Sequence, residues 1–250
     1  MNKLFNLGLM SIFLGLLIWN PSPLQILELK VFDYLITSGE PVQNENILIV
    51  DLDEEIVEAY GGYPLPRDLY ASIIERTSAV PGITVLMPDP DLRNPANDFK
   101  LASAMSDIPT VLASAVSLQS EKGGPHVGTA QLGKDPTPWL FKYPGIIRTE
   151  RNLSLTRSGA GIVTATPELD GVTRRVPLVV NVQDKLYPSF ALELLRVGVG
   201  DPSYQLRTGV SGIESVRIPN YPTITTDPYS RIFLKWNTNF YRQSASEFME

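Results

Sequence analysis

The stretch Ile47–Asp53, ILIVDLD, places four apolar residues directly before an Asp-x-Asp pair. A continuous apolar run without alternation is typical of a strand that is buried on both faces of a sheet. The carboxyl end of such a strand is where an open α/β sheet normally forms its ligand crevice. The sequence therefore predicts that this strand lies at the centre of the sheet, with Asp51 and Asp53 at the edge where a ligand would bind.

A second apolar stretch, Ile83–Met87, follows a predicted helix that begins near Arg67. Strand, helix and strand with short connections predict a βαβ unit whose two strands run parallel. A further helix over Asp98–Ser106 and a strand over Pro109–Val116 continue the alternation, and short strands and turns dominate beyond Gly161. We therefore expect an α/β fold with a central, largely parallel sheet built from βαβ units and a more β-rich C-terminal half.

Composition excludes several classes of protein. Lys and Arg total 21 against 27 Asp and Glu, which gives a net charge of −6 over 250 residues. The charges are scattered and form no basic stripe, so we expect no nucleic-acid partner. Cysteine is absent, which excludes disulfides, thiolate metal sites and a cysteine nucleophile. We expect no cofactor.

The N-terminal segment bears on location. Leu4–Trp19 carries no charge and follows Lys3; as a helix it would be about 24 Å long, against about 30 Å for the hydrocarbon core. It is a signal peptide or a membrane anchor, and the lack of a small-residue cleavage site favours the anchor. The positive charge at Lys3 places the N-terminus in the cytoplasm. We expect residues 1–22 to hold the chain in the inner membrane, with its bulk in the periplasm.

Residues 23–38 are predicted to form a juxtamembrane helix that connects the anchor to the domain over residues 39–250. Asp33, within this helix, is expected to be solvated. The apolar residues of the helix fall on one face, which raises the hypothesis that the chain forms a homodimer through it. The residues of this face are Leu24, Leu27, Val31, Tyr34 and Leu35.

Several motifs follow one another in a fixed order. They are FD at Phe32-Asp33, ILIVDLDE from Ile47, GGYPLPRDLYASII from Gly61, ITVLMPDPD from Ile83, DGVTRRVPLVV from Asp170 and YPSFALELL from Tyr187. From about Leu24 to the C-terminus this series resembles the type-2 CHASE domain (CHASE2), the extracytoplasmic sensory domain of bacterial adenylate cyclases, histidine kinases and serine/threonine kinases.

The resemblance implies an α/β sensor domain for signal transduction, held by a transmembrane helix and coupled to a cytoplasmic output domain. Its signal would be a small molecule or a protein. The sequence departs from the family pattern at Met87-Pro88-Asp89, where an Asp tends to come sooner, and ends at Glu250 before a further strand. We therefore expect the domain to be truncated at its C-terminus.

Five residues are candidates for a ligand site that is not catalytic. Arg67 follows a proline-stiffened loop and could bind an anion or pair with a carboxylate such as Asp51 or Asp53. Arg174 and Arg175 are consecutive on a predicted strand, so their side chains should point to opposite faces and only one should face any crevice. The candidates are Asp51, Asp53, Arg67, Asp89 and Arg174.

The Asp-x-Asp pair leaves other readings open. It resembles the opening of a haloacid-dehalogenase-type phosphohydrolase, in which Asp51 would be the nucleophile and Asp53 the acid/base around Mg²⁺. The later acidic pair of that family is missing here. The carboxylates could also bind Ca²⁺ or Mg²⁺ without catalysis, or cap the backbone of the next turn. A sensor domain without catalytic or metal-binding residues is the favoured interpretation.

Overall fold

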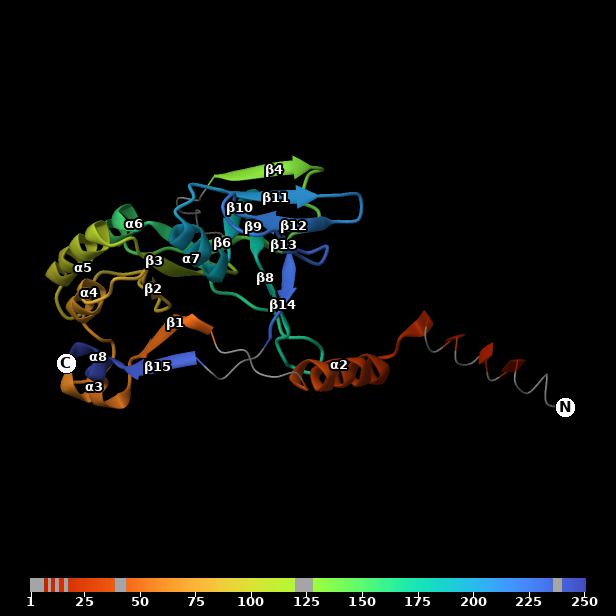
Figure 1. Ribbon diagram of the computed structural model, residues 1–250, viewed down its shortest axis with the longest axis horizontal. Helices are drawn as coiled ribbons and strands as arrows, with labels where there is room; N and C mark the ends of the chain where they lie inside the picture. Colours follow the sequence, from red (N-terminus) through yellow and green to blue (C-terminus); the bar gives the residue numbers. More distant parts are fainter. Residues whose placement is uncertain are drawn as a thin grey trace.

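The computed structural model describes residues 18–38, 44–119, 128–235 and 240–250, and scattered positions between 7 and 15 (Figure 1). The described helices are α2 (Ser22–Thr37), α3 (Glu54–Ala59), α4 (Arg67–Glu75), α5 (Ala96–Asp107), α6 (Arg151–Thr156), α7 (Phe190–Val199) and α8 (Ala245–Met249).

Strands are more numerous and mostly short. They are β1 (Asn44–Asp51), β2 (Gly82–Ile83), β3 (Val111–Ser117), β4 (Thr129–Gly133), β5 (Lys142–Tyr143), β6 (Gly145–Ile147), β7 (Gly159–Ile162), β8 (Arg175–Pro177), β9 (Val179–Val182), β10 (Lys185–Pro188), β11 (Tyr204–Thr208), β12 (Ile213–Arg217), β13 (Ile224–Thr225), β14 (Arg231–Phe233) and β15 (Phe240–Ser244).

Strand β3 is the centre of the helix-covered part of the molecule. It pairs in parallel with β2 and β7 and antiparallel with β6. Its first four residues, Val111 to Ser114, are all buried. The expected βαβ alternation is therefore present in β2–α5–β3. Strand β7 also runs parallel to β3, but the chain between them passes through β4, β5, β6 and α6.

The prediction that Ile47–Asp53 forms the central strand is wrong. Strand β1 pairs in parallel with β15, and within the described residues this ribbon has two strands only. Ile47 is 46% exposed and Leu48 49% exposed, whereas Val50 and Leu52 pack against the buried core around Ile56. Only the end of the apolar run reaches the core, because none of the described residues forms a layer over its first half. The predicted βαβ unit from Ile47–Asp53 to Ile83–Met87 is also wrong, since β2 pairs with β3.

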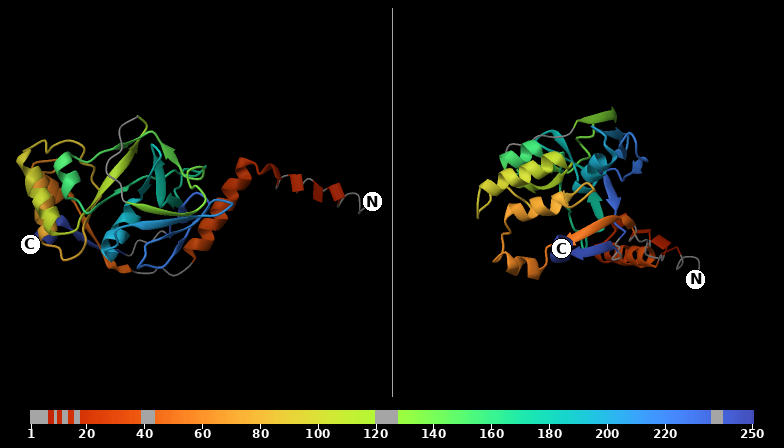
Figure 2. Two further views of the ribbon diagram at one scale, coloured as in Figure 1. Left: turned by 90° about the horizontal axis from the view of Figure 1, so that it is seen from above. Right: turned by 60° about the vertical axis from the view of Figure 1, so that its left-hand side comes forward.

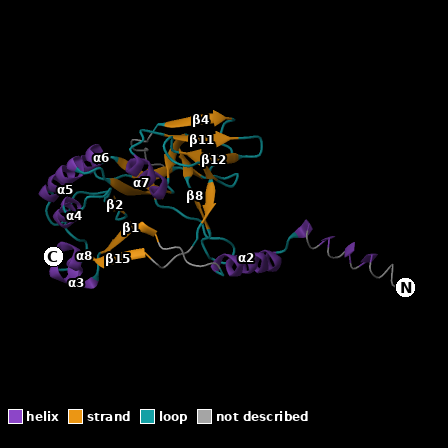
Figure 3. Ribbon diagram, viewed as in Figure 1, coloured by secondary structure: helices purple, strands orange, loops and turns teal. Residues whose placement is uncertain are grey.

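The molecule has two main hydrophobic cores, one in its helical part and one in its β-rich part. The first packs α4 and α5 on the β2–β3 region, and the second packs α7 on β11 and β12. Figure 3 shows α4, α5 and α6 gathered on one side and the strands β4, β11 and β12 on the other. The two views of Figure 2 show α2 leading away from this body toward the N-terminus. The mixed α/β architecture and the β-rich C-terminal half agree with the sequence-based expectation.

Helix α7 illustrates how local sequence sets its bounds. The hydroxyl of Ser189 accepts a hydrogen bond from the backbone N–H of Leu192, as an N-cap does. Gly200 ends the helix in the left-handed conformation, with φ at 78°, which glycine adopts at little cost.

The sequence predicts a membrane anchor at the N-terminus of the chain. Within the part of the chain that is described, no helix is long and apolar enough to cross a membrane. Half of the residues of the segment Leu4–Trp19 lie outside the described residues.

Two glycines give a matched test of the packing between β7 and α7. A Cβ on Gly161 would lie 2.3 Å from the Cα of Phe190, whereas a Cβ on Gly198 would meet nothing within 4 Å. We expect Gly161→Ala to lower the free energy of unfolding by about 1–3 kcal/mol, because backbone must move to admit it. Gly198→Ala should raise it by up to about 1 kcal/mol, because alanine favours a helix interior. Urea unfolding measures both, and equal stabilities for the two variants would contradict the packing described.

Candidate functional site

The five candidate residues are engaged with three different sets of partners. Asp51 and Asp53 lie at the end of β1 and the start of α3. Arg67 and Asp89 belong to the contact between α4 and the loop before α5. Arg174 lies beside α2, in the network described below.

The Asp-x-Asp pair has structural partners. Asp51 forms an ion pair with Arg242 at 3.1 Å, with both side chains about half exposed, and a pair of this kind contributes little to stability. Asp53 accepts a hydrogen bond from the backbone N–H of Ile56 at 2.9 Å and so caps α3. The hydroxyl of Ser246 also donates to Asp53 at 3.3 Å. The interpretation of Asp53 as a backbone cap is confirmed.

Arg67 is buried at the first position of α4. Its guanidinium donates to the carboxylate of Asp98 and to the backbone carbonyl of Asp89. The expected pairing of Arg67 with Asp51 or Asp53 is wrong, because the start of α5 brings Asp98 to the guanidinium instead. The carboxylate of Asp89 itself lies on an exposed residue.

Asp91 organises the loop between β2 and α5. Burial opposes its ionisation, but backbone hydrogen bonds from Arg67, Arg93 and Asn94 and the side-chain amide of Asn97 outweigh burial and lower its pKa. The buried carboxylates of Asp91 and Asp98 are thus satisfied by protein donors. In the described residues, no group of three or more His, Cys, Asp or Glu side chains is arranged to hold a metal ion.

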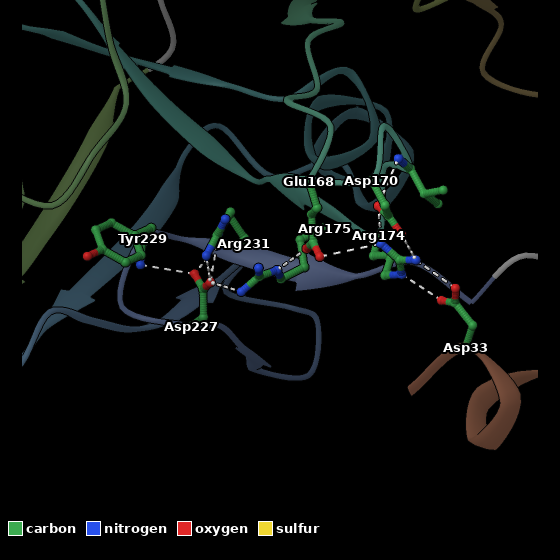
Figure 4. A network of polar contacts seen from close by, with 9 residues as sticks. Asp33, Glu168, Asp170, Arg174, Arg175, Asp227, Tyr229 and Arg231 are labelled. Atoms are coloured by element: carbon green, nitrogen blue, oxygen red, sulfur yellow. Dashed lines mark hydrogen bonds and ion pairs between the residues drawn. The ribbon is translucent and has the colours of Figure 1, made fainter. Parts of the chain in front are cut away.

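Arg174 forms an extensive polar contact among the described residues. Its side chain is only 3% exposed, and two of its nitrogens donate to the carboxylate of Asp33 on α2 at 2.6 Å each. It also donates to both carboxylate oxygens of Asp170, at 2.9 and 2.6 Å. Figure 4 shows the guanidinium between the turn that carries Asp170 and the ribbon of α2. The prediction that Asp33 is a solvated helix residue is right only in part, because its side chain is 43% exposed but also paired with Arg174.

The network continues away from α2 (Figure 4). Glu168 lies 3.6 Å from the guanidinium of Arg174 and accepts a hydrogen bond from Arg175 at 2.7 Å. Arg175 lies 3.9 Å from Asp227, which pairs with Arg231 at 2.7 Å. The prediction that Arg174 and Arg175 face opposite sides is wrong, because both reach Glu168. Arg174 precedes β8, which begins at Arg175, so strand alternation does not govern it.

The charges of this network stabilise one another. Hydrogen bonds from Arg174 lower the pKa of Asp170 to about 2, against the opposing effect of burial. They also lower the pKa of Asp33, while the two carboxylates raise the pKa of Arg174. A nearly buried guanidinium held by ionised carboxylates is a strong, geometrically defined contact.

Aromatic rings reinforce the junction with α2. The ring of Phe32 lies 4.7 Å from that of Phe233 on β14. The guanidinium of Arg175 lies 5.5 Å from the centre of the same Phe233 ring, within the range of a cation–π contact. Two consecutive residues of α2, Phe32 and Asp33, thus attach this helix to the body of the chain.

The junction unites sequence motifs that are far apart in the chain. Asp33 of the FD motif and Arg174 of the DGVTRR motif are 141 residues apart and bonded to each other. A comparison with protein families finds that the model of the CHASE2 domain matches residues 9–250. The chain belongs to the CHASE2 family. Membership indicates an extracytoplasmic sensor domain of a signalling protein. No curated protein and no solved structure matches the chain.

Asp33 is the residue of this CHASE2 domain that sequence reasoning undervalued. Phe32 and Asp33 together form the FD motif of the series, and this motif is the available signal in the sequence. Spacing alone could not supply the partner, because nothing local in a helix indicates a contact with a turn in the second half of the chain.

The lowered pKa of Asp170 predicts a pH dependence. Since its pKa falls from 3.8 to about 2 on folding, its contribution to stability is present above 3.8 and is lost as the pH falls through about 2. We expect Asp170→Asn to be less stable than the wild type near neutral pH and to lose less stability on acidification. Urea midpoints at about pH 7, 4 and 2.5 measure this difference.

Glu28→Gln on α2 is the matched control, because Glu28 is exposed and takes part in no ion pair with a described residue. Its acid response should equal that of the wild type. An Asp170→Asn variant with an unchanged acid response would contradict the role of the ion pair.

Proposed function

We propose that this CHASE2 chain is a non-catalytic, ligand-recognising sensor domain of a membrane-anchored bacterial signalling protein, with its bulk in the periplasm. The observation that supports this most is the junction between Arg174 and Asp33. Helix α2 stands between the N-terminal apolar segment and the body of the chain (Figure 1). A signal passing between the body and the N-terminal segment would therefore pass through α2.

The way α2 is held suits such a role. None of its residues is fully buried, so α2 does not belong to a hydrophobic core. The contacts of Phe32 and Asp33 hold it instead. A change in the turn that carries Glu168 and Asp170 would act directly on the guanidinium that binds α2. Electrostatic contacts of this kind can switch between arrangements more readily than a packed core.

The alternative of a Mg²⁺-dependent phosphohydrolase gains no support from the site. Asp53 would be the acid/base, but its carboxylate accepts the cap hydrogen bond of α3. Asp51 would be the nucleophile, but it pairs with Arg242 on the surface. The geometry around both residues is that of secondary-structure termini.

A pair of reporters tests location and anchoring. A reporter that is active only outside the cytoplasm should be active when fused after Glu250, because Lys3 keeps the N-terminus inside. A cytoplasm-specific reporter at the same position should be silent. Removal of Leu4–Trp19 should reverse both results and release the chain from the membrane fraction. Cytoplasmic activity of the unaltered fusion would exclude the proposal.

We also propose that the chain forms a homodimer through the exposed face of α2. The side chains of Leu27, Val31, Tyr34 and Leu35 are 58%, 51%, 74% and 64% exposed. Together with Leu24 the first three follow the alternating three- and four-residue spacing of a helix that packs on another helix. This face points away from the contacts that Phe32 and Asp33 make with the body.

The double variant Leu27→Glu, Val31→Glu tests this interface. We expect its self-association to be at least about a hundredfold weaker, because burying unpaired charges costs several kcal/mol. Analytical ultracentrifugation of the full chain in non-ionic detergent provides the measurement. Lys30→Glu, on the same helix and also exposed, should associate as the wild type does. Association that survives the double variant would exclude this interface.

A further inference from the structure

A small polar cavity lies beside the central strand β3. Its volume is about 20 Å³, enough for one water-sized group, since roughly 10–15 Å³ is the minimum. Strand β3 pairs with β7 up to Ser114 and with β6 from Ala115 onward, and the cavity is found where this exchange occurs. Its polar lining residues are Ser114, Arg148, Thr149, Ser154, Arg157 and Tyr187.

Arg157 is the distinctive member of this set. It follows α6 as its C-cap, and its side chain is partly buried. Its guanidinium forms no hydrogen bond or ion pair with any described residue. Burial lowers its pKa, and the nearby Glu193 offsets only part of that effect. The positive charge of Arg157 is therefore held in a partly dehydrated place without a direct anionic partner.

The neighbouring acids are committed elsewhere. Both carboxylate oxygens of Glu193 accept hydrogen bonds from Arg196, at 2.8 and 2.9 Å. The carboxylate of Glu150 accepts hydrogen bonds from the backbone N–H groups of Asn152 and Leu153 and caps α6. Neither acid is left to neutralise Arg157 by direct contact.

Other groups of the cavity are also suited to an anion. Thr149 is 7% exposed, and its hydroxyl is buried without a hydrogen-bond partner among the described residues. Burial raises the pKa of Tyr187, and Arg148 and Arg157 oppose that rise, so both guanidiniums act on the same phenol. An unsatisfied buried hydroxyl next to converging positive charge is costly unless a ligand satisfies it.

We propose that this cavity binds a small oxyanion, a phosphate-type or carboxylate group, with Arg157 as its principal ligand and Thr149 as a hydrogen-bond donor. The planar guanidinium can bind two oxygens of such a group at once. The small volume limits the ligand to a small ionic group and leaves no room for a nucleotide. The proposal names a ligand class for the proposed sensor. Binding can be measured without any signalling readout, so its failure would leave the sensor assignment standing.

Isothermal titration calorimetry on the full chain in non-ionic detergent tests the proposal. Inorganic phosphate, sulfate and acetate are titrated separately, with ionic strength held constant by sodium chloride. We expect saturable binding of one equivalent of at least one anion, weakened at least about tenfold in Arg157→Gln, which corresponds to the loss of a charge-assisted contact. Thr149→Val should weaken it as well. The preference between acetate and the tetrahedral anions identifies the carboxylate or the phosphate class.

Arg151→Gln is the matched control, since Arg151 is an exposed residue of the same helix. It should bind as the wild type does. No saturable binding of any of the three anions to the folded chain would overturn the proposal, as would binding that Arg157→Gln leaves unchanged.

A second measurement separates a binding role from a structural one. Removing an uncompensated, partly buried charge should leave the anion-free melting temperature of Arg157→Gln equal to or above that of the wild type. The anion that binds should raise the melting temperature of the wild type and not that of the variant. A variant that melts lower without anion would assign Arg157 a structural role and count against the site.

Discussion

The guanidinium of Arg174 is a buried charge that the fold must neutralise, and the position of α2 depends on how this is done. Two carboxylates from separate segments, Asp33 and Asp170, bind it directly. A charge removed from water without such partners would cost several kcal/mol. Because α2 buries none of its residues, this contact and the ring of Phe32 place the helix, and the core does not. The link between the N-terminal segment and the body is thus mainly electrostatic.

The other buried arginines are neutralised in the same way as Arg174. Arg67, Arg174 and Arg196 are all less than a tenth exposed, and each has a carboxylate within hydrogen-bonding distance. The chain therefore supplies an anion wherever it buries a guanidinium fully. Arg157 departs from this pattern, since it is partly buried and has no direct partner among the described residues. This difference matters because the fully buried arginines are each neutralised by a carboxylate of the chain itself.

Local features of the fold could be predicted from the sequence, and long-range ones could not. The cap at Asp53 and the helix after Arg67 follow from neighbouring residues, and the structure confirms them. The prediction of the central strand is wrong because an apolar run shows that a strand is hydrophobic but does not show how many layers of the fold cover it. The sequence marks Arg67 as an arginine that could pair with a carboxylate, and Arg174 as a candidate for a ligand site. Their partners Asp98 and Asp33 are 31 and 141 residues away, and no periodicity reaches that far.

The wrong prediction of the central strand also made Asp51 and Asp53 candidates for a ligand site. The rule that ligands bind at the edge of an α/β sheet concerns strands inside the sheet, especially where neighbours change. Strand β1 lies outside the sheet that contains β3, in a ribbon with β15. Asp51 at its end therefore forms a surface ion pair, and Asp53 caps α3. Strand β3 lies inside that sheet and exchanges β7 for β6 after Ser114. The cavity with Arg157 lies at this exchange, beside the central strand of the helix-covered part of the molecule.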